Sequence, residues 1–173
     1  MCGVSSLIIL GIDPGTAITG YGIVDYQGNH YKLIEYGVLR TSKDQDVAER
    51  LNDVYIGINK LIEVYKPDCM AIEELFFNKN VKTALQVGQA RGVVMLVAYQ
   101  KKVPIYEFTP LQVKQAVVGY GRAEKKQVQF MVKAILNLSD IPRPDDAADA
   151  LAIAICQGNY CSSGLMLRSD KNC

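Results

Sequence analysis

The chain has 173 residues, of which 49% are hydrophobic and 21% charged, and its formal net charge is +1. This length suits one well-buried domain and is short for two, and the composition is that of an ordinary globular protein. The longest apolar stretches are far shorter than a membrane span, and the first residues lack the basic start and apolar core of a signal peptide. We therefore predict a cytoplasmic protein that makes no membrane contact.

The charge is unevenly distributed along the chain. Residues 60–133 hold twelve Lys and Arg against six Asp and Glu, a net +6, whereas residues 1–59 carry −3 and residues 134–173 carry −2. Such a basic middle could form one positive face for nucleic acid, or it could be solvated helix surface. The five cysteines form no Cys-x-x-Cys pair and there is one histidine, His30, which argues against a structural zinc site.

The first part of the chain reads as three strands joined by short turns. They are "LIILGID" (7–13), "TGYGIVDY" (19–26) and "YKLIEYGVLRT" (31–41), and the turn residues "QGNH" separate the second from the third. Alternating or continuous apolar patterns with such short connections predict an antiparallel meander.

Helices and strands alternate in the rest of the chain. From Val47 to Tyr65 apolar residues recur at three- and four-residue steps, which predicts an amphipathic helix that Pro67 ends. A buried strand (69–76), a long helix (81–102), a strand (103–108) and three helices (111–119, 122–138 and 145–157) follow. We expect Asp145 to cap the last helix, and we interpret residues 159–173 as a polar, flexible tail after a domain of residues 1–158.

This order predicts an α/β fold with a mixed five-stranded sheet, in which three antiparallel strands are followed by parallel strands, and helices cover both faces. On the long helix 81–102, Ala84, Gly88 and Gly92 form a stripe of small residues. The stripe is a candidate dimer contact, and packing against the sheet is an equally good interpretation.

Acidic residues interrupt apolar sequence at three places: Asp13 at the end of the first strand, Glu73 and Glu74 at the end of the fourth, and Asp145, Asp146 and Asp149 at the start of the last helix. Each has an ordinary explanation: Asp-Pro-Gly initiates turns, strand ends carry surface acids, and acids in a first helical turn complement the helix dipole. Ligand sites gather at the carboxyl ends of parallel strands, so the first two groups could meet if their strands are neighbours. Clustered carboxylates without His or Cys suit Mg²⁺ or Mn²⁺.

Five segments, in this order, closely resemble the bacterial RuvC family of Holliday-junction endonucleases: "GIDPGTAITGYGIV", "AIEELFFNKN", "ALQVGQARGVV", "QVKQAVVGYGRAEKKQVQFMV" and "DDAADALAIAI". The resemblance implies a ribonuclease-H-like fold and a homodimer that nicks opposing strands of a four-way DNA junction with Mg²⁺, two ions per site. It implies Asp13, Glu73, Asp146 and Asp149 as the catalytic acids and metal ligands. This selects Glu73 over Glu74, and Asp146 over Asp145.

The resemblance also implies DNA contacts at Phe76, Lys114 and Lys125, and Lys126 is a reasonable additional phosphate contact. Phe76 could stack on an unpaired base, and the adjacent Phe77 competes for that role. The implied partner is the RuvA–RuvB branch-migration complex. Three other functions are alternatives: one lobe of a sugar-kinase-like ATPase, a junction-binding module without catalysis, and a nuclease for RNA ends.

Overall fold

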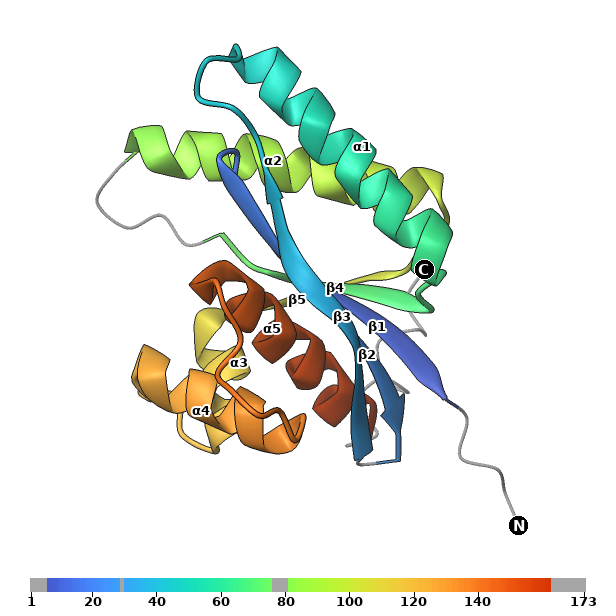
Figure 1. The fold of residues 1–173 in the computed structure, drawn as a ribbon, viewed down its shortest axis with the longest axis vertical. Helices are drawn as coiled ribbons and strands as arrows, with labels where there is room; N and C mark the ends of the chain where they lie inside the picture. The colour runs from blue at the N-terminus through green and yellow to red at the C-terminus, as the bar shows by residue number, and fades with distance from the viewer. Residues whose placement is uncertain (1–5, 29, 76–80, 163–173) are drawn as a thin grey trace, which may run out of the picture.

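A computed structural model describes residues 6–28, 30–75 and 81–162 of the chain. These residues form five strands and five helices (Figure 1). The strands are β1 (Leu7–Asp13), β2 (Ile18–Gln27), β3 (His30–Arg40), β4 (Cys69–Glu73) and β5 (Ile105–Phe108). The helices are α1 (Val47–Tyr65), α2 (Val81–Gln100), α3 (Pro110–Val118), α4 (Lys125–Ile135) and α5 (Asp145–Ser162).

The strands form one sheet in the order β3-β2-β1-β4-β5. β1 is antiparallel to β2 and parallel to β4, and β5 is parallel to β4. The meander and the mixed five-stranded sheet are therefore confirmed, and the first and fourth strands are direct neighbours.

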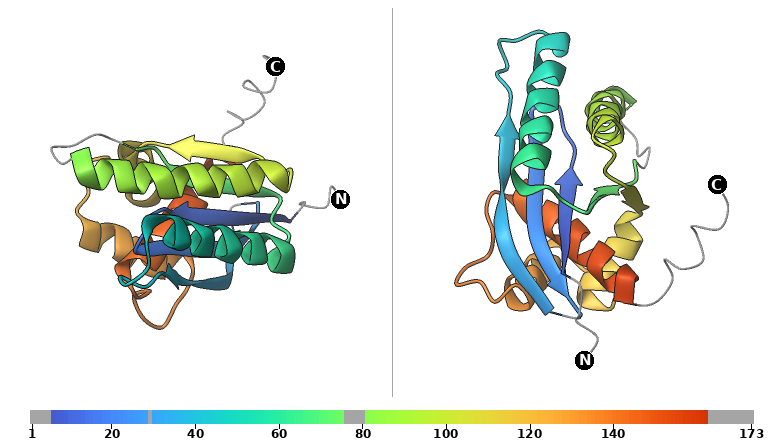
Figure 2. Two further views of the ribbon diagram at one scale, coloured as in Figure 1. Left: turned by 90° about the horizontal axis from the view of Figure 1, so that it is seen from above. Right: turned by 90° about the vertical axis from the view of Figure 1, so that its right-hand side faces the viewer.

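Helices cover both faces of the sheet, with α1 and α2 on one side and α3, α4 and α5 on the other (Figures 1 and 2). A hydrophobic core lies on each face of the sheet, and alternate residues of β1 point into one core or the other. Leu10 and Ile12 pack with buried residues of α1 and α2, whereas Ile9 packs with α3, α4 and α5. The site described below lies where β1 and β4 end, next to the start of α5.

Several predicted boundaries differ from the structure. The helix predicted from 122 begins at Lys125 and ends at Ile135, shortly before Asn137, whose positive φ of 50° is not helical. β4 ends at Glu73 instead of residue 76.

The last helix continues past Gly158, the predicted end of the domain, to Ser162. A Cβ at residue 158 would lie 2.4 Å from the Tyr31 hydroxyl oxygen, and that hydroxyl donates to the Ile155 carbonyl at 2.9 Å. Gly158 thus permits close packing of α5 against β3 and does not mark a helix end. Residues 163–173 lie outside the described residues. Among the described helices, none combines the length and the apolar character that crossing a membrane requires.

Candidate active site

The turn after β1 holds Asp13 at the end of the strand. The Thr19 hydroxyl, fully buried, donates to the carbonyl of Gly15 at 2.7 Å. The Thr41 hydroxyl donates to the carbonyl of Thr16 at 2.6 Å, which ties the same turn to the end of β3. The predicted turn at Asp-Pro-Gly is therefore present, and it restricts the backbone directly after the carboxylate.

Asp13 and Glu73 lie side by side. β1 and β4 pair in parallel with Ile12 opposite Ile72, so the next residue of each strand, Asp13 and Glu73, follows in the same register. Both are the last residues of their strands. Two carboxylates thus meet at the carboxyl edge of the sheet, where α/β proteins commonly bind ligands.

Glycines bring the first turn of α5 against this edge. A Cβ on Gly20, the partner of Asp13 in β2, would lie 2.0 Å from the Asp146 carbonyl oxygen, and one on Gly11 would lie 2.2 Å from that of Ala150. The helix backbone therefore rests directly on the strand backbone, a separation that only glycine allows. This contact carries Asp146 and, one turn later, Asp149 towards Asp13.

The four carboxylates interact electrostatically. Burial, followed by the charges of Asp149, Glu73 and Asp146, raises the pKa of Asp13 from 3.8 to about 7. Burial and the Asp149 charge also raise the pKa of Glu73, while Lys114 and Lys125 oppose that increase. The pKa of Asp149 is raised mainly by burial. Such a cluster is costly in its fully ionised form unless a cation joins it.

Two lysines face these acids across a cavity of about 230 Å³. Asp13, Glu73 and Asp149 line the cavity together with Lys114 of α3 and Lys125 of α4. The Lys125 ammonium lies 2.8 Å from an Asp149 carboxylate oxygen and 3.4 Å from one of Asp145. The protein thus places positive charge on the open side of the acids, where an anionic substrate would enter.

The remaining predicted residues are placed differently. Asp145 is the first residue of α5, and its carboxylate accepts a hydrogen bond from Gln129 of α4 at 3.0 Å, so it faces α4 rather than capping the helix as predicted. Lys126 is exposed on α4 and does not line the cavity. Phe76 and Phe77 lie outside the described residues.

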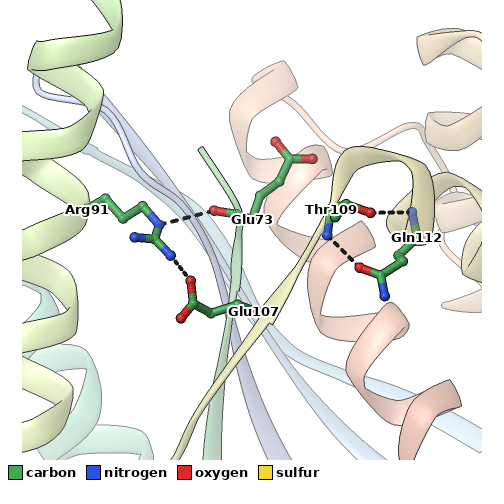
Figure 3. A network of polar contacts seen from close by, with 5 residues as sticks. All are labelled: Glu73, Arg91, Glu107, Thr109 and Gln112. Carbon is green, nitrogen blue, oxygen red and sulfur yellow. Dashed lines mark hydrogen bonds and ion pairs between the residues drawn. The ribbon is translucent and has the colours of Figure 1, made fainter. Parts of the chain in front are cut away.

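Sequence reasoning missed Arg91 of α2. Its Nε donates to the Glu73 carbonyl at 3.4 Å, and its guanidinium forms an ion pair with Glu107 of β5 (Figure 3). It lines a second cavity, of about 250 Å³, on the other side of Asp13 and Glu73. The only sign of it in the sequence is an arginine within a mostly apolar stretch of helix, and this pattern does not show which group the arginine binds.

The acids suit a hard divalent cation by their donor type, because all four offer carboxylate oxygens only. Within residues 6–28, 30–75 and 81–162, no three Asp, Glu, His or Cys side chains stand close enough to enclose an ion in their present positions. Lys125 is paired with Asp149 instead. A cation that binds Asp149 would therefore compete with this ion pair.

Known proteins match the chain over nearly its whole length. Residues 9–157 match the family model described as crossover junction endodeoxyribonuclease RuvC. Relatives with the same description include that of Desulforamulus reducens, 59% identical over 91% of this chain and 96% of the relative. That of Ruminiclostridium cellulolyticum is 57% identical over 95% of this chain and 99% of the relative.

Solved structures agree with the sequence matches. Thermus thermophilus RuvC in complex with a Holliday junction substrate matches with a TM-score of 0.87 and 36% identity, over 91% of this chain and 96% of that one. The yeast mitochondrial Holliday junction resolvase Ydc2 has a TM-score of 0.67 at 16% identity, covering 94% of this chain and 81% of that one. The second match shows likeness of fold alone, and the first shows that the ribonuclease-H-like fold is present.

Proposed function

This chain belongs to the RuvC family of crossover junction endodeoxyribonucleases, and we propose that it cuts Holliday junctions at a site built from Asp13, Glu73, Asp146 and Asp149. As a member of this family of metal-dependent nucleases it is an endonuclease of DNA recombination and repair. One observation carries the assignment of the site: the half-buried Asp13 carboxylate, its pKa raised to about 7, lies among three further acids and faces two lysines.

The proposed cofactor is Mg²⁺, with Mn²⁺ as a substitute and two ions per site. Asp13, Glu73 and Asp146 would hold the ions, and Asp149 would hold an ion or orient the attacking water. When bound, the ions supply an activated water and charge neutralisation at the phosphodiester. The fit rests on the all-oxygen donor set and on the energetic cost of four adjacent carboxylates.

The lysines have a separate task in this proposal. Lys114 lines the cavity beside Glu73 and would offset negative charge on the scissile phosphate. Lys125 would hold the scissile phosphate or a flanking one once it leaves Asp149, and Lys126 would contact the backbone further along α4. Base stacking by Phe76 stays a prediction, because that residue lies outside the described residues.

The test compares adjacent acids. Asp13→Asn, Glu73→Gln and Asp146→Asn should each abolish cleavage of a synthetic four-way junction in Mg²⁺ and leave junction binding intact. The neighbouring variants Glu74→Gln and Asp145→Asn serve as controls and should retain cleavage. Normal cleavage by Asp13→Asn would refute the site. Linear duplex and structured RNA, assayed with and without Mg²⁺, test the preference for junctions.

We further propose a homodimer, because two nicks in opposing strands need two active sites. The contact would lie along α2, where Leu85, Leu96 and Tyr99 are 62%, 49% and 80% exposed. Gly92 lies at helical spacing from these residues, and a Cβ there would meet nothing within 4 Å, whereas Ala84 of the predicted small-residue stripe is buried. Large exposed apolar side chains at helical spacing are typical of a protein interface.

The oligomeric state tests the dimer directly. Leu96→Glu should shift the mass measured by light scattering towards a monomer, and Ile56→Glu on α1, where Ile56 is 55% exposed, should leave it unchanged. Equal effects of the two variants would contradict a contact along α2. The RuvA–RuvB complex is the proposed partner that delivers the junction, and the cytoplasm is the proposed location.

A further inference from the structure

Arg91 is anchored between two strands next to the acids. It projects from α2 with its side chain only 19% exposed. Its Nε donates to the carbonyl of Glu73 in β4, and its terminal nitrogen pairs with the Glu107 carboxylate of β5 (Figure 3). The guanidinium therefore has two protein partners and does not point freely into solvent.

The direction of the Glu73 peptide groups explains why its carbonyl is free to accept from a side chain. The N–H groups of Met70 and Glu74 donate to the carbonyls of Pro104 and Phe108, which places these even-numbered β4 residues against β5. Peptide groups of successive residues in a strand point to opposite sides. The carbonyl of Glu73 consequently points towards β1.

Pro14 cannot supply the hydrogen bond that this carbonyl would receive from β1. Ile12 lies opposite Ile72, so continuing the parallel register pairs Glu73 with Asp13. In a parallel ladder the donor to the Glu73 carbonyl would then be the N–H of residue 14. That residue is proline, which has no backbone N–H. The ladder stops at the residue that carries a candidate catalytic carboxylate.

We propose that Arg91 is a positioning residue: its guanidinium replaces the backbone donor that Pro14 lacks, and so holds the end of β4 with the Glu73 carboxylate aimed at Asp13. Glu107 keeps the guanidinium in place by pairing with its other nitrogen. Arginine suits this task because one rigid plane carries separated donors for two acceptors, whereas lysine carries all its donors on one nitrogen at the end of a flexible chain. The inference rests on the proposed role of Glu73 as a metal ligand.

The proposal separates Arg91 from a DNA contact. A residue that orients a metal ligand should affect metal affinity, typically about 10- to 100-fold. A residue that binds a phosphate should affect junction affinity and lower the slope of its salt dependence by about one. The two readouts are measured independently, on the protein alone and on its junction complex.

The experiment uses the full chain and Mn²⁺ as the probe. Arg91→Gln and Arg91→Lys should weaken Mn²⁺ binding, measured by calorimetry without DNA, about 10-fold or more. They should raise the Mg²⁺ concentration needed for half-maximal cleavage and leave junction affinity in Ca²⁺, with its salt slope, unchanged. Glu107→Gln should have the same effect with a smaller size. The control is Lys101→Gln, which breaks an exposed ion pair with Glu63 away from the site and should bind Mn²⁺ normally.

A second variant tests whether Arg91 supplies the hydrogen-bond donor that Pro14 lacks. Pro14→Ala restores an N–H at residue 14, so Pro14→Ala combined with Arg91→Gln should bind Mn²⁺ more tightly than Arg91→Gln alone. Thermal unfolding of each variant verifies that it is folded, and Glu107→Gln carries the test if the Arg91 variants are not.

The proposal is overturned if the folded Arg91 variants, or Glu107→Gln in their place, bind Mn²⁺ like the wild type, if they lose junction affinity instead, or if Pro14→Ala gives no recovery. Glu73→Gln is run in parallel: unchanged Mn²⁺ binding by that variant would refute the proposed metal site, independently of Arg91.

Discussion

Replacing Gly20 by alanine tests whether backbone contact between β2 and α5 sets the position of Asp146. An added Cβ would lie 2.0 Å from the Asp146 carbonyl oxygen and 3.2 Å from the Ala147 nitrogen. Carbon and carbonyl oxygen normally approach to about 3.3 Å. The first turn of α5 must therefore move by about 1 Å, because both partners of the clash are backbone atoms and neither can rotate away.

This displacement has two expected consequences. Overpacking of this kind costs about 1–3 kcal/mol in the free energy of unfolding, which urea denaturation measures. A misplacement of about 1 Å at a catalytic group lowers the rate by about 100-fold. We expect Gly20→Ala to remain folded at 25 °C and to show this loss in single-turnover cleavage of a junction at saturating protein.

Gly22→Ala is the matched control on the same strand. Its Cβ would lie 2.6 Å from the Leu151 side chain, so it should lower the free energy of unfolding by a similar amount but not press on Asp146. Cleavage by folded Gly22→Ala should stay within a few-fold of the wild-type rate. Wild-type cleavage by Gly20→Ala, or an equal loss in both variants, would refute the reasoning.

Three further results are expected. Without divalent cations, the free energy of unfolding should fall as pH rises from about 4 to 7. The reason is that burial and neighbouring acids raise the folded-state pKa of Asp13 from 3.8 to about 7. The stability that protonated Asp13 contributes is fully present below the unfolded-state pKa and is lost as pH rises past the folded-state pKa. Asp13→Asn should remove up to about 3 kcal/mol of that decline between pH 5 and pH 8, measured by urea titrations in EDTA, and an unchanged pH dependence would contradict the assignment. Lys125→Met should weaken junction binding and reduce the slope of its salt dependence by about one, measured by fluorescence anisotropy, whereas an unaltered slope would rule out a phosphate contact. Asp46→Ala removes the capping box with Glu49 at the start of α1 and should cost about 1 kcal/mol of stability in thermal unfolding without changing cleavage.

Local patterns predicted most of the secondary structure. The strand 7–13 and the helix from Val47 to Tyr65 have the predicted bounds, because apolar periodicity and a following proline act within a few residues. The predicted end of α5 was wrong because Gly158 packs against Tyr31, which is far away in the sequence. A glycine that permits close packing and one that ends a helix look the same in a single sequence.

The residue types of the candidate site could be predicted from the sequence, but the packing contacts that position them could not. Six candidate acids could be named because carboxylates that interrupt apolar sequence are unusual, and the resemblance to the RuvC family selected four of them. Their meeting depended on β1 lying beside β4, which follows from the pairing of distant strands and could only be stated as a condition. The contact of Arg91 with Glu73 and the approach of α5 to Gly20 also depend on tertiary packing, so no local pattern marks them.

The acids lie far apart in the sequence, and this orders their assembly during synthesis. Asp13 is made first and Glu73 follows, but Asp146 and Asp149 belong to α5, which also covers one face of β1 and β2. A growing chain on the ribosome therefore holds neither the complete set of acids nor the helix that buries half of its sheet. On the proposed assignment of the site, nuclease activity therefore requires that synthesis has passed Asp149 and that α5 has packed on the sheet.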